Sequence, residues 1–198
     1  MEVREPVVAY GKTKLSVEEY LDWERSTERK HEFHKGTLFA MPAHKFIHNI
    51  IAVNLLGSLV VRGKDRNCEF FGGDRRIHIP QDDFFTYPDI SIVCPTPVTL
   101  NEDGENILNP AVLVEVLSPS TRHYDPEEKF QLYRDIPTLQ EYILVDSETV
   151  GITAWRIDER KEWAPEEYHL LGESLYLPVI SLNLPLAEIY EGTYLALS

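Results

Sequence analysis

Three stretches of the chain carry apolar residues at the spacing of α-helices. A short helix is predicted over about Val17–Arg25, because Ser16 and Glu19 have the arrangement of a capping box at its start. A longer amphipathic helix is predicted over His44–Arg62. The third predicted helix starts at Asp125, where the pattern Asp-Pro-x-Glu is typical of a helix with aspartate as its N-cap.

Strand-like runs separate these helices. The segment KHEFHKGTLFAM predicts a hairpin turning at Lys35-Gly36, and CEFFGGDRRIHIP predicts two short strands around Gly72-Gly73. Ala111–Leu117 and the later EYILVD are almost wholly apolar, as in strands buried on both faces. A further hairpin is expected around Glu159-Arg160, followed by an apolar tail that prolines interrupt.

The order of these elements predicts an α/β or α+β fold, with a central mixed β-sheet flanked by helices and extra β-hairpins. A chain of 198 residues is expected to form a single domain. Its core is expected over about 16–146, with a strand-rich C-terminal extension over about 147–198. The apolar character of that extension makes it a candidate surface for a homodimer.

Composition and charge make some classes of protein less consistent with this sequence. No apolar run approaches the roughly 20 residues of a membrane span, and the N-terminus lacks the apolar core of a signal peptide, so no membrane partner is expected. Cys68 and Cys94 show no metal-binding spacing and are expected to be buried free thiols, as in a cytoplasmic protein. The formal charge of −14 disfavours non-specific nucleic-acid binding, which would need a local basic patch, a metal or a dimeric groove.

Candidate chemistry begins with two carboxylates on neighbouring strands. Glu115 interrupts the apolar run, where an isolated charge is costly unless it is paired or binds a metal. Asp89 opens the preceding strand, just after Pro88. If the two strands lie side by side, Asp89 and Glu115 meet, and paired carboxylates of this kind hold hard cations such as Mg²⁺. Their mutual repulsion is expected to raise carboxylate pKa values without metal.

One further pattern concerns the basic residues. Lys and Arg are scattered, with a mild cluster that is the best candidate for contacting phosphate, although plain solvated surface is the more ordinary interpretation. Its members are Arg62, Lys64, Arg66, Arg75 and Arg76.

Three segments together resemble a known family. They are the PD at Pro88-Asp89, VEVLSPST ending in Ser118-Pro119-Ser120-Thr121, and YDPEEKFQLYRDIPTLQEYILVD with Asp125 and Lys129. The chain resembles the Uma-two family of restriction-endonuclease-like proteins, in the PD-(D/E)xK nuclease superfamily. The resemblance covers most of the chain, extends to HEFHKGTLFAM and HNIIAVNLL, and implies a restriction-endonuclease-like core.

The resemblance also implies roles for the matched residues. Asp89 and Glu115 would be the metal ligands, holding Mg²⁺ or Mn²⁺. The superfamily lysine normally stands two residues after the second carboxylate, where this chain has Leu117, and Lys129 is the expected substitute. Glu32 would be an auxiliary carboxylate and His48 a further catalytic candidate, although a satisfied core histidine is the more ordinary interpretation.

Three functions therefore remain open from the sequence. The first is a Mg²⁺-dependent endonuclease acting on nucleic acid, with DNA favoured and a homodimer expected. The second is a catalytically silent binding or structural module, favoured by Leu117 and by the acidic charge. The third is a hydrolase of small phosphate esters, to which an acidic surface is less of an obstacle.

Overall fold

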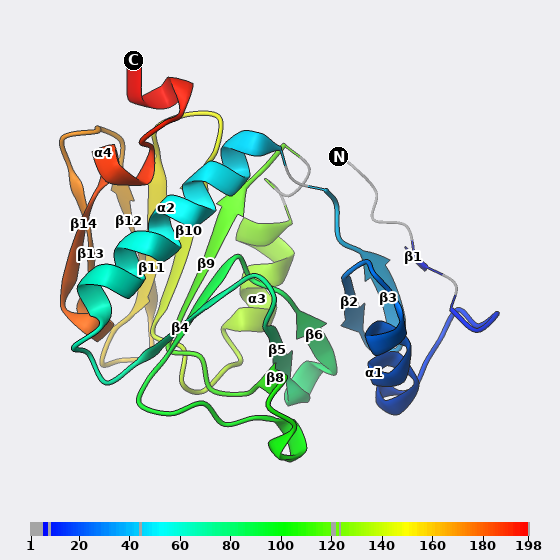
Figure 1. Cartoon of the computed structure of the whole chain (residues 1–198). Helices are drawn as coiled ribbons and strands as arrows, with labels where there is room; N and C mark the ends of the chain where they lie inside the picture. The colour runs from blue at the N-terminus through cyan, green and yellow to red at the C-terminus, as the bar shows by residue number, and fades with distance from the viewer. Residues whose placement is uncertain (1–5, 8, 44, 120–121, 123, 198) are drawn as a thin grey trace.

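A six-stranded sheet forms the centre of the computed structural model, which describes residues 6–7, 9–43, 45–119, 122 and 124–197 (Figure 1). Its strand order is β12-β11-β10-β9-β7-β4. The strand bounds are β4 Glu69–Gly72, β7 Ile90–Val93, β9 Val112–Leu117, β10 Glu141–Asp146, β11 Ile152–Ile157 and β12 Trp163–Tyr168. Strands β9 and β10 pair in parallel and the other pairs are antiparallel, so the sheet is mixed as predicted.

The register of β7 and β9 sets the two candidate carboxylates against each other. Ile90 pairs with Val114. Continuing this antiparallel register by one residue places Asp89, immediately before β7, opposite Glu115 on β9. The β9 residues that alternate with Glu115, Leu113 and Leu117, belong to the core on the same face of the sheet.

Two hydrophobic cores cover the two faces of the central sheet. Helix α2 (Phe46–Gly63) crosses one face, and α3 (Phe130–Tyr133) lies behind the other in Figure 1. The C-terminal hairpin of β13 (Ser174–Leu177) and β14 (Leu182–Pro185), with α4 (Leu186–Ile189), joins the core beneath α2. Most apolar side chains of the C-terminal tail are thus buried in the protein's own core. Few of them remain exposed to form the dimer surface considered from the sequence.

A second sheet lies to one side, with order β1-β3-β2-β6-β5-β8. Its bounds are β1 Pro6–Val7, β2 His31–His34, β3 Thr37–Ala40, β5 Arg76–Ile79, β6 Phe84–Thr86 and β8 Asn106–Ile107. Helix α1 (Val17–Ser26) packs on it, with the predicted capping box at Ser16 and Glu19. The predicted hairpin turn is confirmed: Lys35 and Gly36 both have positive φ, which suits glycine at the second position.

The predicted pair of strands around Gly72-Gly73 is also present, but its members separate. Strand β4 joins the central sheet through β7, whereas β5 joins the second sheet through β6 and β8. The chain between them therefore passes from one sheet to the other, directly before the residues that lead to Asp89.

Helix α2 differs from the sequence expectation in one respect. By length and composition alone it could cross a membrane, and 28% of it is buried among the described residues. The expectation that no run approaches this length was therefore wrong. Ile51, Leu55 and Leu59 nonetheless pack fully into the core under α2, as the periodicity predicts. The predicted first residue of this helix, His44, lies outside the described residues.

The third helical segment starts differently from the prediction. A π-helical turn, η3 (Asp125–Lys129), precedes α3, and Tyr124 rather than Asp125 occupies the N-cap position. Asp125 is itself buried inside the helical segment. Its side chain is therefore available to the cluster around Lys129.

The expectation of free thiols was wrong. Cys68 and Cys94 form a disulfide. The pairing of Glu69 with Val93 in strands β4 and β7 places these cysteines opposite each other at the end of the ladder. The expectation of a cytoplasmic location was based on free thiols. Because the two cysteines are joined in a disulfide, the cysteines no longer support that location.

Candidate active site

Lys129 lies at the centre of a buried group of carboxylates. Its Nζ lies 2.7 Å from Glu115 Oε1, 3.1 Å from Glu32 Oε1 and 3.6 Å from Asp125 Oδ1. Lys129 is 3% exposed and Glu115 is 5% exposed, so the contacts form almost without solvent. Lys129 and Asp125 thus form a buried pair rather than a surface contact.

The elements that meet here come from distant parts of the chain. Glu115 points from the middle of β9, Glu32 from β2 of the second sheet, and Lys129 from the π-helical turn that precedes α3. Tyr133, one turn after Lys129, donates a hydrogen bond of 2.7 Å to Glu115 Oε1. The two residues thus approach the carboxylate from one side of the same helical segment, as their spacing predicts.

Glu32 is held by two hydroxyl groups as well as by Lys129. Thr86 on β6 donates to its Oε1 at 2.5 Å, and Tyr124 donates to its Oε2 at 3.2 Å. Both carboxylate oxygens therefore have partners from this chain. This arrangement makes Glu32 an anchor for the Lys129 ammonium.

Asp89 and His48 form the other half of the cluster. The backbone N–H of Val116 donates to Asp89 Oδ2 at 2.7 Å, and His48 Nε2 lies 3.1 Å from the same oxygen. His48 is buried in the first turn of α2. All five residues singled out in the sequence therefore lie in one region, in two neighbouring groups joined at the Asp89–Glu115 position of the sheet.

The electrostatics of Glu115 reflect this crowding. Burial raises the pKa of Glu115 to about 8 against the opposing charge of Lys129, and the charges of Asp125 and Asp89 add to the increase. The rise agrees in direction with the sequence expectation for clustered carboxylates. Burial alone would lower the pKa of Lys129, but Glu115 and Glu32 outweigh it and hold that pKa well above its usual value.

The donor set fits a hard cation that shares its coordination with substrate. Mg²⁺ is commonly bound by one or two carboxylates, with water and substrate phosphates as the remaining ligands. Asp89 and Glu115 supply two carboxylates at opposed positions of adjacent strands. Among the described residues, the polar contacts of Glu115 with Lys129 and Tyr133 both fall on Oε1, which leaves Oε2 for a further ligand. Within the described residues, no three His, Cys, Asp or Glu side chains are grouped as a complete metal cage.

Two members of the cluster were not predicted from the sequence as site residues. Asp125 was interpreted as a helix cap, yet Asp125 and Tyr133 both face the Lys129 group. The i, i+4, i+8 spacing of Asp125, Lys129 and Tyr133 was the signal that could have found them. Ser120 and Thr121, from the motif that carried the family resemblance, lie outside the described residues.

The basic cluster considered for phosphate contact is largely engaged elsewhere. Arg62 forms an ion pair with Glu188 on α4, and Arg76 is 5% exposed and forms an ion pair with Glu105. Arg76 also lies against the ring of Tyr20 beneath α1. The interpretation of Arg76 as an accessible phosphate contact is therefore not supported by its burial.

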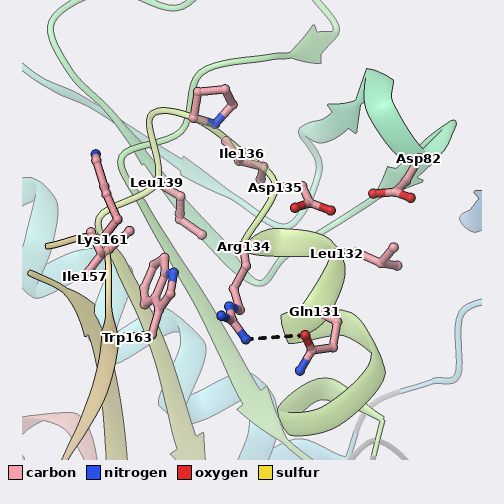
Figure 2. A pocket seen from close by; sticks show the side chains of 11 residues that line it. Asp82, Gln131, Leu132, Arg134, Asp135, Ile136, Leu139, Ile157, Lys161 and Trp163 are labelled. Carbon is pink, nitrogen blue, oxygen red and sulfur yellow. Dashed lines mark hydrogen bonds between the residues drawn. The ribbon is translucent and has the colours of Figure 1, made fainter.

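A separate open pocket of about 750 Å³ lies at the C-terminal end of α3 (Figure 2). Figure 2 shows Arg134 and Trp163 on one side of it and Asp82 with Asp135 on the other. Burial raises the pKa of Asp135, and a hydrogen bond with Asp82 adds to the effect. None of the five candidate site residues lines this pocket, so it is distinct from the Lys129 cluster.

Comparison with known proteins identifies the family. Residues 17–187 match the family model Uma2, described as "Putative restriction endonuclease". The chain belongs to the Uma2 family. The family resemblance inferred from the sequence is thereby confirmed, and all five candidate residues lie inside the matched region.

Two similar Synechocystis proteins are described as uncharacterized. This Uma2 protein is 35% identical over 179 residues to an uncharacterized protein of Synechocystis sp., covering 90% of this chain and 93% of the relative. A second uncharacterized Synechocystis protein is 31% identical over 160 residues, covering 81% of this chain and 89% of the relative. The family is therefore clear, whereas these relatives assign no substrate.

A solved structure supports the fold. The crystal structure of a protein from Anabaena variabilis, described as a putative nuclease belonging to DUF820, has a TM-score of 0.72 and 18% sequence identity. The match covers 89% of this chain and 97% of the other. This Uma2 protein thus has an α+β fold similar to that of the Anabaena protein.

Proposed function

We propose that this protein is a metal-dependent endonuclease that hydrolyses phosphodiester bonds of nucleic acid, with DNA as the favoured substrate. The observation that carries the proposal is the contact of Lys129 with Glu115. Glu115 stands at the position of β9 that the register of the sheet places opposite Asp89. A lysine beside two carboxylates on adjacent strands of a mixed sheet supplies groups that phosphodiester hydrolysis can use. Membership of the Uma2 family supports the same class of reaction.

Asp89 and Glu115 would hold Mg²⁺, or Mn²⁺ in its place. When bound, the ion offsets phosphate charge and lowers the pKa of the attacking water. The Val116 N–H and His48 fix the orientation of Asp89 before any ligand arrives. This preorganisation means that the carboxylate does not have to be reoriented when the site is filled.

Lys129 supplies the positive charge that the reaction needs. Its ammonium, oriented by Glu32, would stabilise negative charge that develops on the phosphate. The position two residues after Glu115, Leu117, is buried and apolar, so it cannot do this. Lys129 reaches the same carboxylate from the next helical segment, which accounts for the altered spacing.

The substrate must approach an acidic protein. A formal charge of −14 repels nucleic acid, so binding would depend on the metal and on local contacts. We expect cleavage to decline steeply with ionic strength, and we propose a homodimer as the working unit. A cytoplasmic location, where nucleic acid is present, is also part of the proposal.

Calorimetric titration of Mg²⁺ and Mn²⁺, with cleavage of plasmid DNA and of RNA on the same samples, tests this function. Glu115→Gln and Asp89→Asn should lose both metal binding and cleavage. Lys129→Met should bind metal but cleave at least about 100-fold more slowly, as when one charge-stabilising group is removed. Glu167→Gln on β12, an exposed glutamate, is the matched control and should behave like wild type.

One alternative function has a specific observation in its favour. The Lys129–Glu115 pair is buried and satisfied within the protein, as in a silent nuclease-fold module that uses the pair only for stability. In that case wild-type protein binds no Mg²⁺ or Mn²⁺ and cleaves neither nucleic acid. Metal binding with cleavage of small phosphate esters alone would instead indicate the third function considered from the sequence.

A further inference from the structure

Helix α2 carries an exposed apolar stripe along its outer face. Phe46 is 92% exposed, Val53 61% and Val60 47%. Ile50 and Gly57 continue the same line, with successive steps of four and three residues along the helix. In Figure 1 the outer face of α2 lies in front of the central sheet, with no other element over it. Contiguous exposed apolar side chains of this kind mark interaction surfaces.

The distribution of acidic residues along the chain favours a second copy of this chain as the partner of the stripe. The chain has 33 acidic residues, yet none stands between Glu32 and Asp65, a stretch that contains the whole of α2. Two copies of a chain with a formal charge of −14 repel each other over most of their surfaces. Helix α2 itself therefore contributes no carboxylate to a contact between two copies, and Glu188 on the neighbouring α4 is paired with Arg62.

We propose that the outer face of α2 is a self-association surface, on which α2 of a second copy packs antiparallel. Steps of four and three residues are the spacing with which two helices interlock side chains along a seam. An antiparallel alignment that places Phe46 opposite Gly57 of the second copy also places Ile50 opposite Val53. The contact is then symmetric, because each residue finds the same partner in both directions.

The size match between Phe46 and Gly57 supports this register. Phe46 has the largest side chain of the stripe, and Gly57 has none. A Cβ added at Gly57 would meet nothing within 4 Å, so the surface over it is open. A phenyl ring from the second copy can therefore occupy that position. A lipid bilayer would accept any apolar stripe and would not require a large residue to oppose a small one.

The inference does not depend on nuclease activity, and sedimentation equilibrium of the full chain tests it. Wild type should move from a mass of 22.9 kDa at low concentration towards twice that mass as concentration rises. Val53→Asp should remain monomeric, because it buries a like-charged pair near the two-fold axis. Leu170→Asp, at an exposed apolar residue outside α2, is the matched control and should associate as wild type does.

A size exchange tests the register. Gly57→Phe should weaken association at least 10-fold by opposing two phenyl rings, and Phe46→Gly should weaken it by removing the ring. The combined Phe46→Gly and Gly57→Phe variant should restore association, because it exchanges the two partners. Failure of the combined variant to recover would overturn the antiparallel register.

Two other outcomes would overturn the whole inference. Wild type that stays at 22.9 kDa up to millimolar concentration has no self-association surface. Wild type that stays monomeric yet binds neutral phosphatidylcholine vesicles, with loss of binding in Val53→Asp, would assign the stripe to a membrane instead. Glu115→Gln should leave association unchanged, so failure of the proposed catalysis and failure of this inference are separate results.

Discussion

Lys129 and Glu32 lie 3.1 Å apart, although one comes from the segment before α3 and the other from a hairpin strand of the second sheet. The contact joins the two sheets across the candidate active site. It gives the Lys129 ammonium a second anchor besides Glu115, from a different sheet. A group held from two sides loses little further freedom when it acts on a bound phosphate.

Removal of the Lys129 charge should destabilise the protein strongly. Lys129→Met leaves Glu115 and Glu32 buried without their cation, and loss of one partner of a buried pair costs about 3–5 kcal/mol. Urea unfolding without metal measures the change. The combined Glu115→Gln and Lys129→Met variant should lose less than the sum of the two single variants. An additive result would mean that the two groups do not interact.

The hydroxyl of Tyr133 should contribute more than that of Tyr142. Tyr133 donates to the carboxylate of Glu115, whereas Tyr142 donates to the backbone carbonyl of Asp125 at 3.1 Å. A hydrogen bond to a charged group is worth about 1.5–3 kcal/mol and a neutral one about 0.5–1.5 kcal/mol. Urea unfolding of Tyr133→Phe and Tyr142→Phe at pH 9, above the pKa of about 8 of Glu115, compares them directly, and equal losses would contradict a charged Glu115 in the folded protein at that pH.

Asp146 should make stability depend on pH in the acid range. Burial would raise the pKa of Asp146, but hydrogen bonds from Arg122 and from the backbone of Glu148 and Thr149 hold this pKa below its usual value. A lowered folded-state pKa adds stability above the unfolded-state pKa, and this stability is lost as pH falls through the folded-state value. Asp146→Asn should therefore destabilise by about 1 kcal/mol at pH 7, since the pair is partly exposed.

The Asp146→Asn variant also tests the effect of acidic pH on stability. As the pH falls through the lowered folded-state pKa, wild-type Asp146 becomes protonated, so the difference in unfolding free energy between wild type and Asp146→Asn should shrink. Urea unfolding at pH 7 and at a series of acidic pH values measures this difference. A difference that stays constant, or grows on acidification, would show that the ionised carboxylate is not what stabilises this position.

The disulfide should be detectable both by the reactivity of the thiols and by its contribution to the free energy of unfolding. Cys68 and Cys94 close a loop with a sequence separation of 26, and cross-links of this length are worth about 2–4 kcal/mol. Native protein purified without reductant should show no thiol reactive to a chromogenic reagent after unfolding. Reduction should lower the unfolding free energy by that amount, while Cys68→Ser should do the same without reductant. Two reactive thiols in the unreduced protein would contradict the pairing.

Local pattern was enough to predict most of the elements. The capping box at Ser16, the hairpin turn at Lys35-Gly36 and the apolar run around Glu115 each depend on neighbours within a few residues, so the sequence contains the information directly. Glu115 was found for the same reason, since a charge inside an apolar run is conspicuous without any tertiary knowledge.

Other features depended on which segments pair over long distances. The sequence alone could not separate β4 and β5 into different sheets or place Cys68 opposite Cys94, because pairing depends on long-range contacts. The exposed side of α2 could not be foreseen either. Its apolar residues encircle the helix, and only packing on the sheet determines which of them remain in solvent.

The candidate active site also combines features that depend on local sequence with features that depend on long-range contacts. The sequence by itself determined the residue types: one carboxylate at the start of a predicted strand, a second inside another strand, and a lysine one helical turn before a tyrosine. The tertiary structure decided that Lys129 contacts Glu115 and that Glu32 is its second anchor. The physical reason is that a side chain's chemistry is local, whereas a shared buried ion pair exists only where separate elements pack together and exclude water.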